Sequence, residues 1–376
     1  MTSSFDDVTA AEASNEGLNV TGGCRVSDRQ LPYLPWNNPD NVISMETQKL
    51  VTTVLSVFVT SICTVGVATN VVNCIVYFKL GLTDRINLLL FSQAIADFVS
   101  CVYFFLVSVE YTCGLFLSDL SGFRQMREAL TNSGATSMHG TVYVSGFIST
   151  FIACERCLCI TSPFKAQKFL RTSTTGVAVA MVTVVFMGLH YLVSSKFKFG
   201  CEYVPAIRAS ISVHYPSEFY LKNSGFVDIL NIIVFGLCLP FLFVITASIT
   251  TVVTVVKLRR AVTWRQSSAT VIMEAREVAL TKMLVAVSCV FIVCTLPNVI
   301  SRVTQLFVPD VKLGGRKQNI HMLGIGVVYL FNAINASINF FFYYKMGSRF
   351  REVLQSMCGR RSLVEIRKQL TTVTTK

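Results

Sequence analysis

The sequence contains few charged residues. Asp, Glu, Lys and Arg make up 14% of its 376 residues, whereas soluble domains average about 25%. Hydrophobic residues make up 52%, and the mean hydropathy is +0.56. Such a composition argues against a soluble enzyme, and against a nucleic-acid-binding surface, which needs clustered Lys and Arg on a polar face. Disorder is excluded away from the chain ends, because disordered chains are poor in apolar residues. These exclusions leave an integral membrane protein.

The sequence also lacks the motifs of common catalytic and metal centres. It has no His-Glu-x-x-His, no P-loop and no nucleophile elbow, and its four His are scattered. Cys154 and Cys157 have a metal-like spacing, but no second pair completes a site. We therefore expect neither an enzyme nor a resident cofactor. A seven-helix transporter or channel stays open as an alternative, although no internal repeat supports it.

Long stretches without a charged residue indicate transmembrane helices. A helix needs about 20 mostly apolar residues to cross a bilayer. Six stretches of 19 to 29 residues lie between charged positions 49 and 79, 128 and 155, 171 and 196, 228 and 257, 282 and 302, and 317 and 345. A seventh, from Ile86 to Val109, is interrupted only by Asp97. Their length excludes a β-barrel, whose strands are about ten residues long. The sequence therefore predicts an all-α membrane protein, with a seven-transmembrane helix bundle over residues 49–345.

The distribution of basic residues predicts which end of the chain is cytoplasmic. We assign each charge to the nearer side of the membrane. The side with the C-terminus then has 20 Lys or Arg and 7 Asp or Glu, and the side with the N-terminus has 13 Lys or Arg and 14 Asp or Glu. By the positive-inside rule we expect a plasma-membrane protein with a cytoplasmic C-terminus. Residues 1–48 would form a flexible extracellular tail, in which Asn19 begins a glycosylation sequon. We expect no signal peptide, since no basic segment precedes an apolar one at the start.

A short amphipathic helix is predicted directly after the last span, over residues 346–358. Its apolar residues recur at intervals of three and four and would form one face: Met346, Phe350, Val353, Leu354 and Met357. Such a helix lies in the membrane interface. Cys358 at its end is a candidate for palmitoylation. Residues 359–376 would be a cytoplasmic tail, in which the Thr residues of 371–375 are candidate phosphorylation sites for arrestin.

Ionisable residues and prolines inside the spans mark candidate functional positions. Asp97 lies midway along the second span, where a charge is costly, so it is either functional or a neutral group bonded to a neighbouring helix. Glu155 and Arg156 end the third span. Because adjacent helical residues do not face each other, we expect each to need another partner. Pro240 and Pro297 would kink the fifth and sixth spans and allow their cytoplasmic ends to swing.

Five short motifs resemble those of rhodopsin-like (class A) G protein-coupled receptors, in the family's order and on the expected spans. They are 66-GVATNVV-72, 93-QAIADF-98, 155-ERCLCITSPF-164, 294-CTLP-297 and 339-NFFFY-343. Phe350 also follows Tyr343 by seven residues, as expected for the family's eighth helix. The resemblance covers residues 47–358 and implies the family's fold, a seven-helix bundle with a short eighth helix.

The sequence departs from the family's pattern at several positions. Cys157, Thr295 and Phe340 replace an aromatic residue, a Trp and a Pro within the motifs. Thr131 stands where the family has a Cys at the top of the third helix, and Ser248 stands where a Tyr is common. The fourth span has no Trp. We interpret the chain as a divergent member, from an expanded invertebrate peptide or chemosensory group.

The resemblance implies a receptor that binds an extracellular ligand and activates a heterotrimeric G protein. A peptide is the ligand that we expect. The alternative ligand is a small chemosensory molecule. In the closed state Arg156 would pair with Glu155 and with Glu277. The residues implied in the switch are Glu155, Arg156, Glu277, Asn339, Tyr343, Pro240, Phe291 and Pro297.

The resemblance also implies a polar pocket around the carboxylate of the second span. Its members would be Asn70, Asp97, Ser145, Asn335 and Asn339. Oxygen ligands around one carboxylate suit a hard cation such as sodium. The alternative is a water-filled hydrogen-bond network without an ion.

The ligand site is less well defined by the sequence. Met138 stands eighteen residues before Arg156, where amine receptors carry the amine-binding Asp, so a monoamine is disfavoured. Glu110 and Asp228 could hold a basic or amidated peptide and Arg302 a carboxylate; alternatively, all three are interfacial charges. The candidate lining residues are Glu110, Met138, His139, Tyr143, Asp228, Asn298, Arg302 and Tyr329.

Three Cys lie on the predicted extracellular side, where disulfides persist. With Thr131 in place of the family's third-helix Cys, we expect Cys201 to pair with Cys113. The alternative is a Cys24–Cys201 bridge, since three Cys cannot all pair within one chain.

Overall fold

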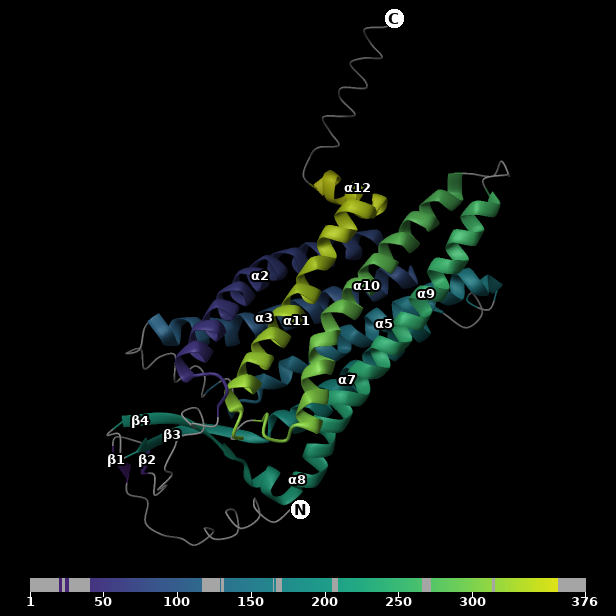
Figure 1. The fold of residues 1–376 in the computed structure, drawn as a ribbon. Helices are drawn as coiled ribbons and strands as arrows, with labels where there is room; N and C mark the ends of the chain where they lie inside the picture. Colours follow the sequence, from purple (N-terminus) through teal and green to yellow (C-terminus); the bar gives the residue numbers. More distant parts are fainter. Residues whose placement is uncertain are drawn as a thin grey trace, which may run out of the picture.

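The computed structural model describes residues 20–21, 24–26, 41–116, 129, 132–164, 166, 171–204, 209–265, 272–312 and 315–357 (Figure 1). Side chains are described for these residues except within 20–26, 110–111, 113–116, 199, 201–214 and 261–277. The described part is a bundle of long helices with a small sheet at one end (Figure 1). Asn19 and Cys358 lie outside the described residues, as does the predicted tail 359–376.

Seven segments of the described chain are long and apolar enough to cross a membrane. They are α2 (Met45–Leu80), α3 (Arg85–Phe116), η2 with α5 (Ala135–His139 and Gly140–Thr161), α7 (Thr172–Ser194), α8 with η4 and α9 (Glu218–Asp228, Ile229–Cys238 and Leu239–Arg265), α10 (Ile272–Phe307) and α11 (Gln318–Met346). A short helix α12 (Ser348–Met357) follows. The predicted all-α, seven-helix architecture is confirmed.

Polar residues explain where the first two spans begin and end. Ser44 caps α2, because its Oγ accepts the backbone N–H of Thr47 at 3.2 Å. Gly81 ends α2 with φ of 93°, a conformation that glycine adopts without a Cβ clash. Asp84 then accepts the backbone N–H of Ile86 through Oδ1 at 3.0 Å at the start of α3. The short turn makes α2 and α3 antiparallel neighbours.

Both predicted prolines lie at irregular or interrupted positions of their spans. Pro240 is the second residue of α9 and lies two residues after the end of η4, a π-helical segment over Ile229–Cys238. Pro297 lies inside α10. Proline has no N–H to donate to the carbonyl four residues earlier, so each one removes a helical hydrogen bond. A π-helical turn is wider than an α-helical one, and such turns are frequent at functional sites.

The sheet was not anticipated by the sequence patterns. Its strands are β1 (Val20–Thr21), β2 (Cys24–Val26), β3 (Phe197–Val204) and β4 (Ala209–Pro216), in the order β1-β2-β3-β4. β3 and β4 form an antiparallel hairpin between α7 and α8, and β2 pairs in parallel with β3. We call this end of the bundle the sheet end and the opposite end the α12 end (Figure 1).

Two clusters of buried side chains lie inside the bundle. At the α12 end, the ring of Tyr343 packs edge-on against Tyr77, with centroids 5.3 Å apart, and both rings contact Phe350 of α12. A second cluster joins α2, α3 and α11 and includes Phe104 and Ala333, both fully buried. The first cluster attaches α12 to the bundle, so the amphipathic helix is part of the core there.

Candidate functional site

The Gly-x-x-x-Asn motif of the first span lies against α11. A Cβ added at Gly66 would lie 2.2 Å from Ser337 Oγ and 2.7 Å from Cys101 Sγ, so only glycine fits. One turn later, Asn70 Nδ2 donates to the carbonyl of Ala336 at 2.7 Å. This motif therefore couples α2 to α11 through backbone approach and a side-chain hydrogen bond.

The carboxylate of Asp97 is fully buried and joins three helices. Ser145 of α5 donates to its Oδ1 at 2.6 Å, and Asn339 of α11 donates to its Oδ2 at 2.9 Å. Asn70 bonds to backbone carbonyls instead, and Asn335 is half-buried without a side-chain hydrogen bond in the described part of the chain. Three of the five predicted pocket residues are thus brought into contact.

These contacts form a hydrogen-bond network rather than a ready set of sodium ligands. Asn339 presents its amide N–H and not its oxygen to Asp97, and the hydroxyl of Ser145 points its proton at the carboxylate. A hard cation is held by oxygen lone pairs. Ser145 Oγ keeps its lone pairs while it donates, and only Asn339 would have to turn to present its oxygen to a cation, so sodium binding at Asp97 stays a prediction.

Glu155 lies at the α12 end with its carboxylate shared between two arginines. Arg156 donates to Glu155 through Nε at 2.6 Å and Nη2 at 2.5 Å. Arg85, the first residue of α3, donates to the same carboxylate through Nε at 2.8 Å and Nη2 at 2.5 Å. The side chain of Glu155 is 0% exposed, and those of Arg156 and Arg85 are 13% and 19% exposed. A buried carboxylate is stable as a charge only when it is paired in this way.

Glu155 and Arg156 form the ion pair that the resemblance implied, and Glu155 has the further partner that we expected. The two side chains are long enough to bend around the helix and meet. The second partner of Glu155 is Arg85, which the sequence patterns did not single out. Glu277 lies on α10, but its side chain is outside the described ones, so its pairing with Arg156 stays a prediction.

A small cavity of about 10 Å³ lies beside Arg156, between α5, α9 and α10. It is lined by Ala153, Arg156, Thr251, Thr254, Leu284, Val285 and Ser288. The hydroxyls of Thr251 and Thr254 are buried and have no hydrogen-bond partner among the described residues. Arg156 therefore borders a space with two hydroxyl groups that have no hydrogen-bond partner among the described residues.

The remaining switch residues lie in the packed core near these groups. Asn339 and Tyr343 are buried on α11, one turn apart. Phe291 packs against Phe243 of α9, and both rings lie over Gly146, where an added Cβ would lie 3.1 Å from the Phe243 ring. The last contact brings α9 and α10 close to α5, on the sheet-end side of Arg156.

At the sheet end, His139 is surrounded by rings from four helical segments. Its Nδ1 lies 3.4 Å from His190 Nε2 of α7. Its ring centroid lies 5.8 Å from that of Tyr143 and 6.2 Å from that of Tyr329. Phe235 of η4 closes the group, with its ring 4.8 Å from Tyr143 and 5.4 Å from His190. We call His139, Tyr143, His190, Phe235 and Tyr329 the aromatic cluster.

Arg302 of α10 lies next to this cluster. A Cβ added at Gly236 of η4 would lie 3.3 Å from Arg302 Cδ, so the missing side chain of Gly236 leaves room for the arginine. Gly236 directly follows Phe235 of the cluster, so this contact places Arg302 at the edge of the cluster. Within the described residues, Arg302 makes no ion pair and one long hydrogen bond, to Gln305 Oε1 at 3.3 Å.

Asp228, in contrast, is already neutralised. Lys196 donates to its Oδ1 at 2.6 Å, and Tyr220 donates to its Oδ2 at 3.0 Å. Lys196 also lies 4.5 Å from the centre of the Tyr220 ring. Asp228 was expected either to hold a basic ligand or to be an interfacial charge. In the structure its carboxylate is already paired with Lys196.

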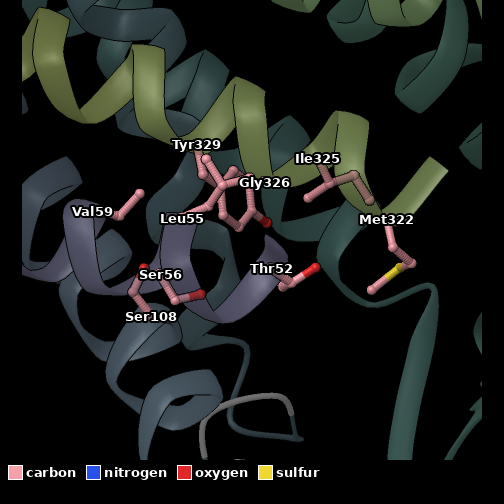
Figure 2. Close-up of a pocket in the computed structure, with 9 residues that line it drawn as sticks. All are labelled: Thr52, Leu55, Ser56, Val59, Ser108, Met322, Ile325, Gly326 and Tyr329. Atoms are coloured by element: carbon pink, nitrogen blue, oxygen red, sulfur yellow. The ribbon is translucent and has the colours of Figure 1, made fainter. Parts of the chain in front are cut away.

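A cavity of about 20 Å³ lies between α2, α3 and α11 near the sheet end (Figure 2). Its lining is Thr52, Leu55, Ser56, Val59, Ser108, Met322, Ile325, Gly326 and Tyr329. A space of this size holds about one water molecule. Tyr329 belongs both to this cavity and to the aromatic cluster, so the two adjoin each other.

The sequence model of the family described as "Serpentine type 7TM GPCR chemoreceptor Srw" matches residues 57–361. The match covers most of the chain, from within the first span, α2, to residue 361. The chain belongs to this family. It is therefore a G protein-coupled receptor of the seven-transmembrane type and a multi-pass membrane protein. No curated protein matches the receptor closely enough to serve as a relative.

Several predicted positions of the receptor lie away from its two sites or outside the described side chains. Met138 packs against the second core cluster, and Asn298 is half-buried on α10. The side chains of Glu110, Cys113 and Cys201 are outside the described ones. The roles proposed for these three residues remain predictions.

Sequence reasoning missed three residues of these sites, Arg85, His190 and Phe235. Two of them had a weak signal: Arg85 is a basic residue at the start of a span, and His190 is the only His within the fourth span. Neither signal names a partner, because the contacts are with residues of other helices.

Proposed function

We propose that this receptor binds a small chemical ligand at the sheet end and activates a heterotrimeric G protein at the α12 end. The observation that carries the proposal is that one helix, α5, connects both sites. His139 directly precedes α5, and Arg156 lies on it seventeen residues later, a separation of about 26 Å at 1.5 Å per residue. A shift at the ligand site can thus reach Arg156 through one rigid element.

The proposed mechanism is a two-state switch in which ligand changes the population of the states. In the closed state, Glu155 and Glu277 hold Arg156. In the open state, the α12-end halves of α9 and α10 move outward at Pro240 and Pro297, and Arg156 becomes available to the G protein. Tyr343 and Asn339 rearrange with it, as the resemblance to rhodopsin-like receptors implies.

A small chemosensory ligand is better supported than the peptide that the sequence first favoured. The peptide was expected to use Glu110 and Asp228 to bind its basic groups. Asp228 is paired with Lys196, so releasing it would cost the energy of a partly buried ion pair. The Srw family description also names chemoreceptors.

The proposed orientation places the N-terminus and the sheet outside the cell and α12 in the cytoplasm of the plasma membrane. The excess of basic residues on the α12 side supports it. Asn19 would then be available for glycosylation and Cys358 for palmitoylation. The Thr residues of 371–375 would be available for the phosphorylation that arrestin recognises.

Nucleotide exchange on a purified heterotrimeric G protein, measured with the receptor reconstituted in lipid, tests the proposal. We expect the wild-type receptor to accelerate exchange and Arg156→Ala to abolish the effect at matched surface expression. Glu277→Gln should raise exchange in the absence of ligand, because it removes one partner of Arg156. Equal exchange by wild type and Arg156→Ala would contradict the proposal, and transport of a solute would favour the transporter alternative.

A further inference from the structure

We infer that the ligand is a small aromatic carboxylate, whose carboxylate pairs with Arg302 and whose ring packs within the aromatic cluster. This inference rests on the proposed function and specifies the ligand's chemical class. It uses two features of the sheet end: an arginine without an acidic partner among the described side chains, and flat side chains next to it.

The first feature is the unused donor capacity of Arg302. A guanidinium has five N–H donors, and the described chain satisfies one of them, through the 3.3 Å bond to Gln305. The side chain is half-buried and lies against Gly236 of the π-helical segment. A cation withdrawn from water without a counter-charge is costly. A carboxylate ligand removes this cost, and it matches the fork of donors with two parallel hydrogen bonds.

The second feature is the set of rings beside Arg302. Arg302 lies against Gly236, which directly follows Phe235, and the Phe235 ring lies 4.8 Å from that of Tyr143 and 5.4 Å from that of His190. Asp228, the acidic candidate from the sequence whose side chain is described, is paired with Lys196 instead. This set of groups favours an anion and disfavours an amine.

The third step concerns the size and shape of the ligand. The cluster rings lie at centroid distances of 4.8 to 6.2 Å, which is the range in which aromatic rings pack favourably. The cavity that Tyr329 lines holds about one water molecule (Figure 2), so a ligand ring enters the cluster only by displacing cluster side chains. A single ring with a short acidic chain displaces fewer side chains than a peptide.

The experiment measures thermal unfolding of the purified, full-length receptor in detergent. The probes are benzoate, phenylacetate and indole-3-acetate, each beside its amide, together with phenethylamine. We expect at least one carboxylate to raise the unfolding temperature while its amide and the amine do not. In Arg302→Gln the apparent affinity for that carboxylate should fall at least tenfold. Lys312→Gln, which removes an exposed cation of the α10–α11 loop, should leave it unchanged.

A second variant keeps the test decisive if Arg302→Gln fails to fold. Gly236→Ala retains the charge but places a Cβ 3.3 Å from Arg302 Cδ, so it should also weaken carboxylate binding. The inference is overturned if no carboxylate stabilises the receptor, if an amide or the amine stabilises it equally, or if binding is unchanged in the Arg302 and Gly236 variants.

Nucleotide exchange measured on the same samples separates this inference from the proposed function. Stabilisation by a carboxylate without any G protein exchange supports the anion site and contradicts the receptor mechanism. Exchange driven by the amine and not by a carboxylate supports the mechanism and overturns the anion site.

Discussion

Arg85 and Glu155 are seventy residues apart in the chain, yet Arg85 Nε lies 2.8 Å from Glu155 Oε1. The pair joins the first turn of α3 to the end of α5, where Glu155 also holds Arg156. The buried carboxylate of Glu155 thus pairs both with Arg156, which we propose contacts the G protein, and with Arg85, for which we propose no such contact. The strength of the closed state then depends on both arginines.

Arg85→Gln should lower ligand-independent nucleotide exchange, by several fold. Without Arg85, Glu155 Oε1 no longer divides its interaction between two arginines, so its pair with Arg156 becomes stronger in the closed state. Glu155→Gln should have the opposite effect, because it frees Arg156. Arg349→Gln, which neutralises an exposed arginine of α12, serves as the control and should leave exchange unchanged. Higher basal exchange in Arg85→Gln would show that Arg85 itself keeps the receptor closed.

Gly66→Ala should destabilise the receptor by about 1–3 kcal/mol, the typical cost of overpacking a core. The added Cβ would lie 2.2 Å from Ser337 Oγ, so α2 and α11 must separate. The matched control is Gly188→Ala on α7, where an added Cβ meets nothing within 4 Å. Thermal unfolding in detergent should show a lower midpoint for Gly66→Ala alone. Equal midpoints would mean that the two helices are not in close contact at this point.

Thr254→Val should raise the unfolding temperature of the ligand-free receptor. The Thr254 hydroxyl is buried without a partner in the described structure, and an unsatisfied buried polar group costs about 1–3 kcal/mol. Valine has the same shape without that group. Thr250→Val on the same helix is the control, since Thr250 Oγ1 donates to the carbonyl of Thr246 at 2.7 Å. If both variants behave alike, the Thr254 hydroxyl has a partner in the native receptor.

Mass spectrometry of the non-reduced receptor should find a disulfide at Cys201. The register pairs Arg25 of β2 with Glu202 of β3, so Cys24 and Cys201, one residue earlier on each strand, stand at corresponding positions. Neighbouring strands are about 4.8 Å apart, within the roughly 7 Å limit for a bridge. This favours Cys24–Cys201 over the pairing with Cys113. A peptide joining Cys113 to Cys201 would restore the first expectation, and a free thiol at Cys201 would exclude both.

The sequence predicted the spans well because membrane helices are encoded locally. In a bilayer the backbone must satisfy its own hydrogen bonds, so a charge-free run of sufficient length predicts a helix without knowledge of its neighbours. Asp97 was likewise identifiable, since an acidic residue in such a run is unusual, and Ser145 and Asn339 do contact it. The sheet could not be predicted, because β2 pairs with a strand about 175 residues away and short strands have weak local patterns.

The sequence by itself therefore determined that this protein crosses a membrane seven times and which ionisable residues lie within the crossings. Only the tertiary structure decided how those residues are paired: that Arg85 shares Glu155 with Arg156, that Lys196 neutralises Asp228, and that Arg302 has no acidic partner in the described chain. The reason is physical. Whether a segment forms a transmembrane helix depends on a run of about twenty mostly apolar residues, which is a local property. Whether two charged residues form an ion pair depends on how their helices are rotated and how closely they approach, and the sequence of one helix does not determine the position of another.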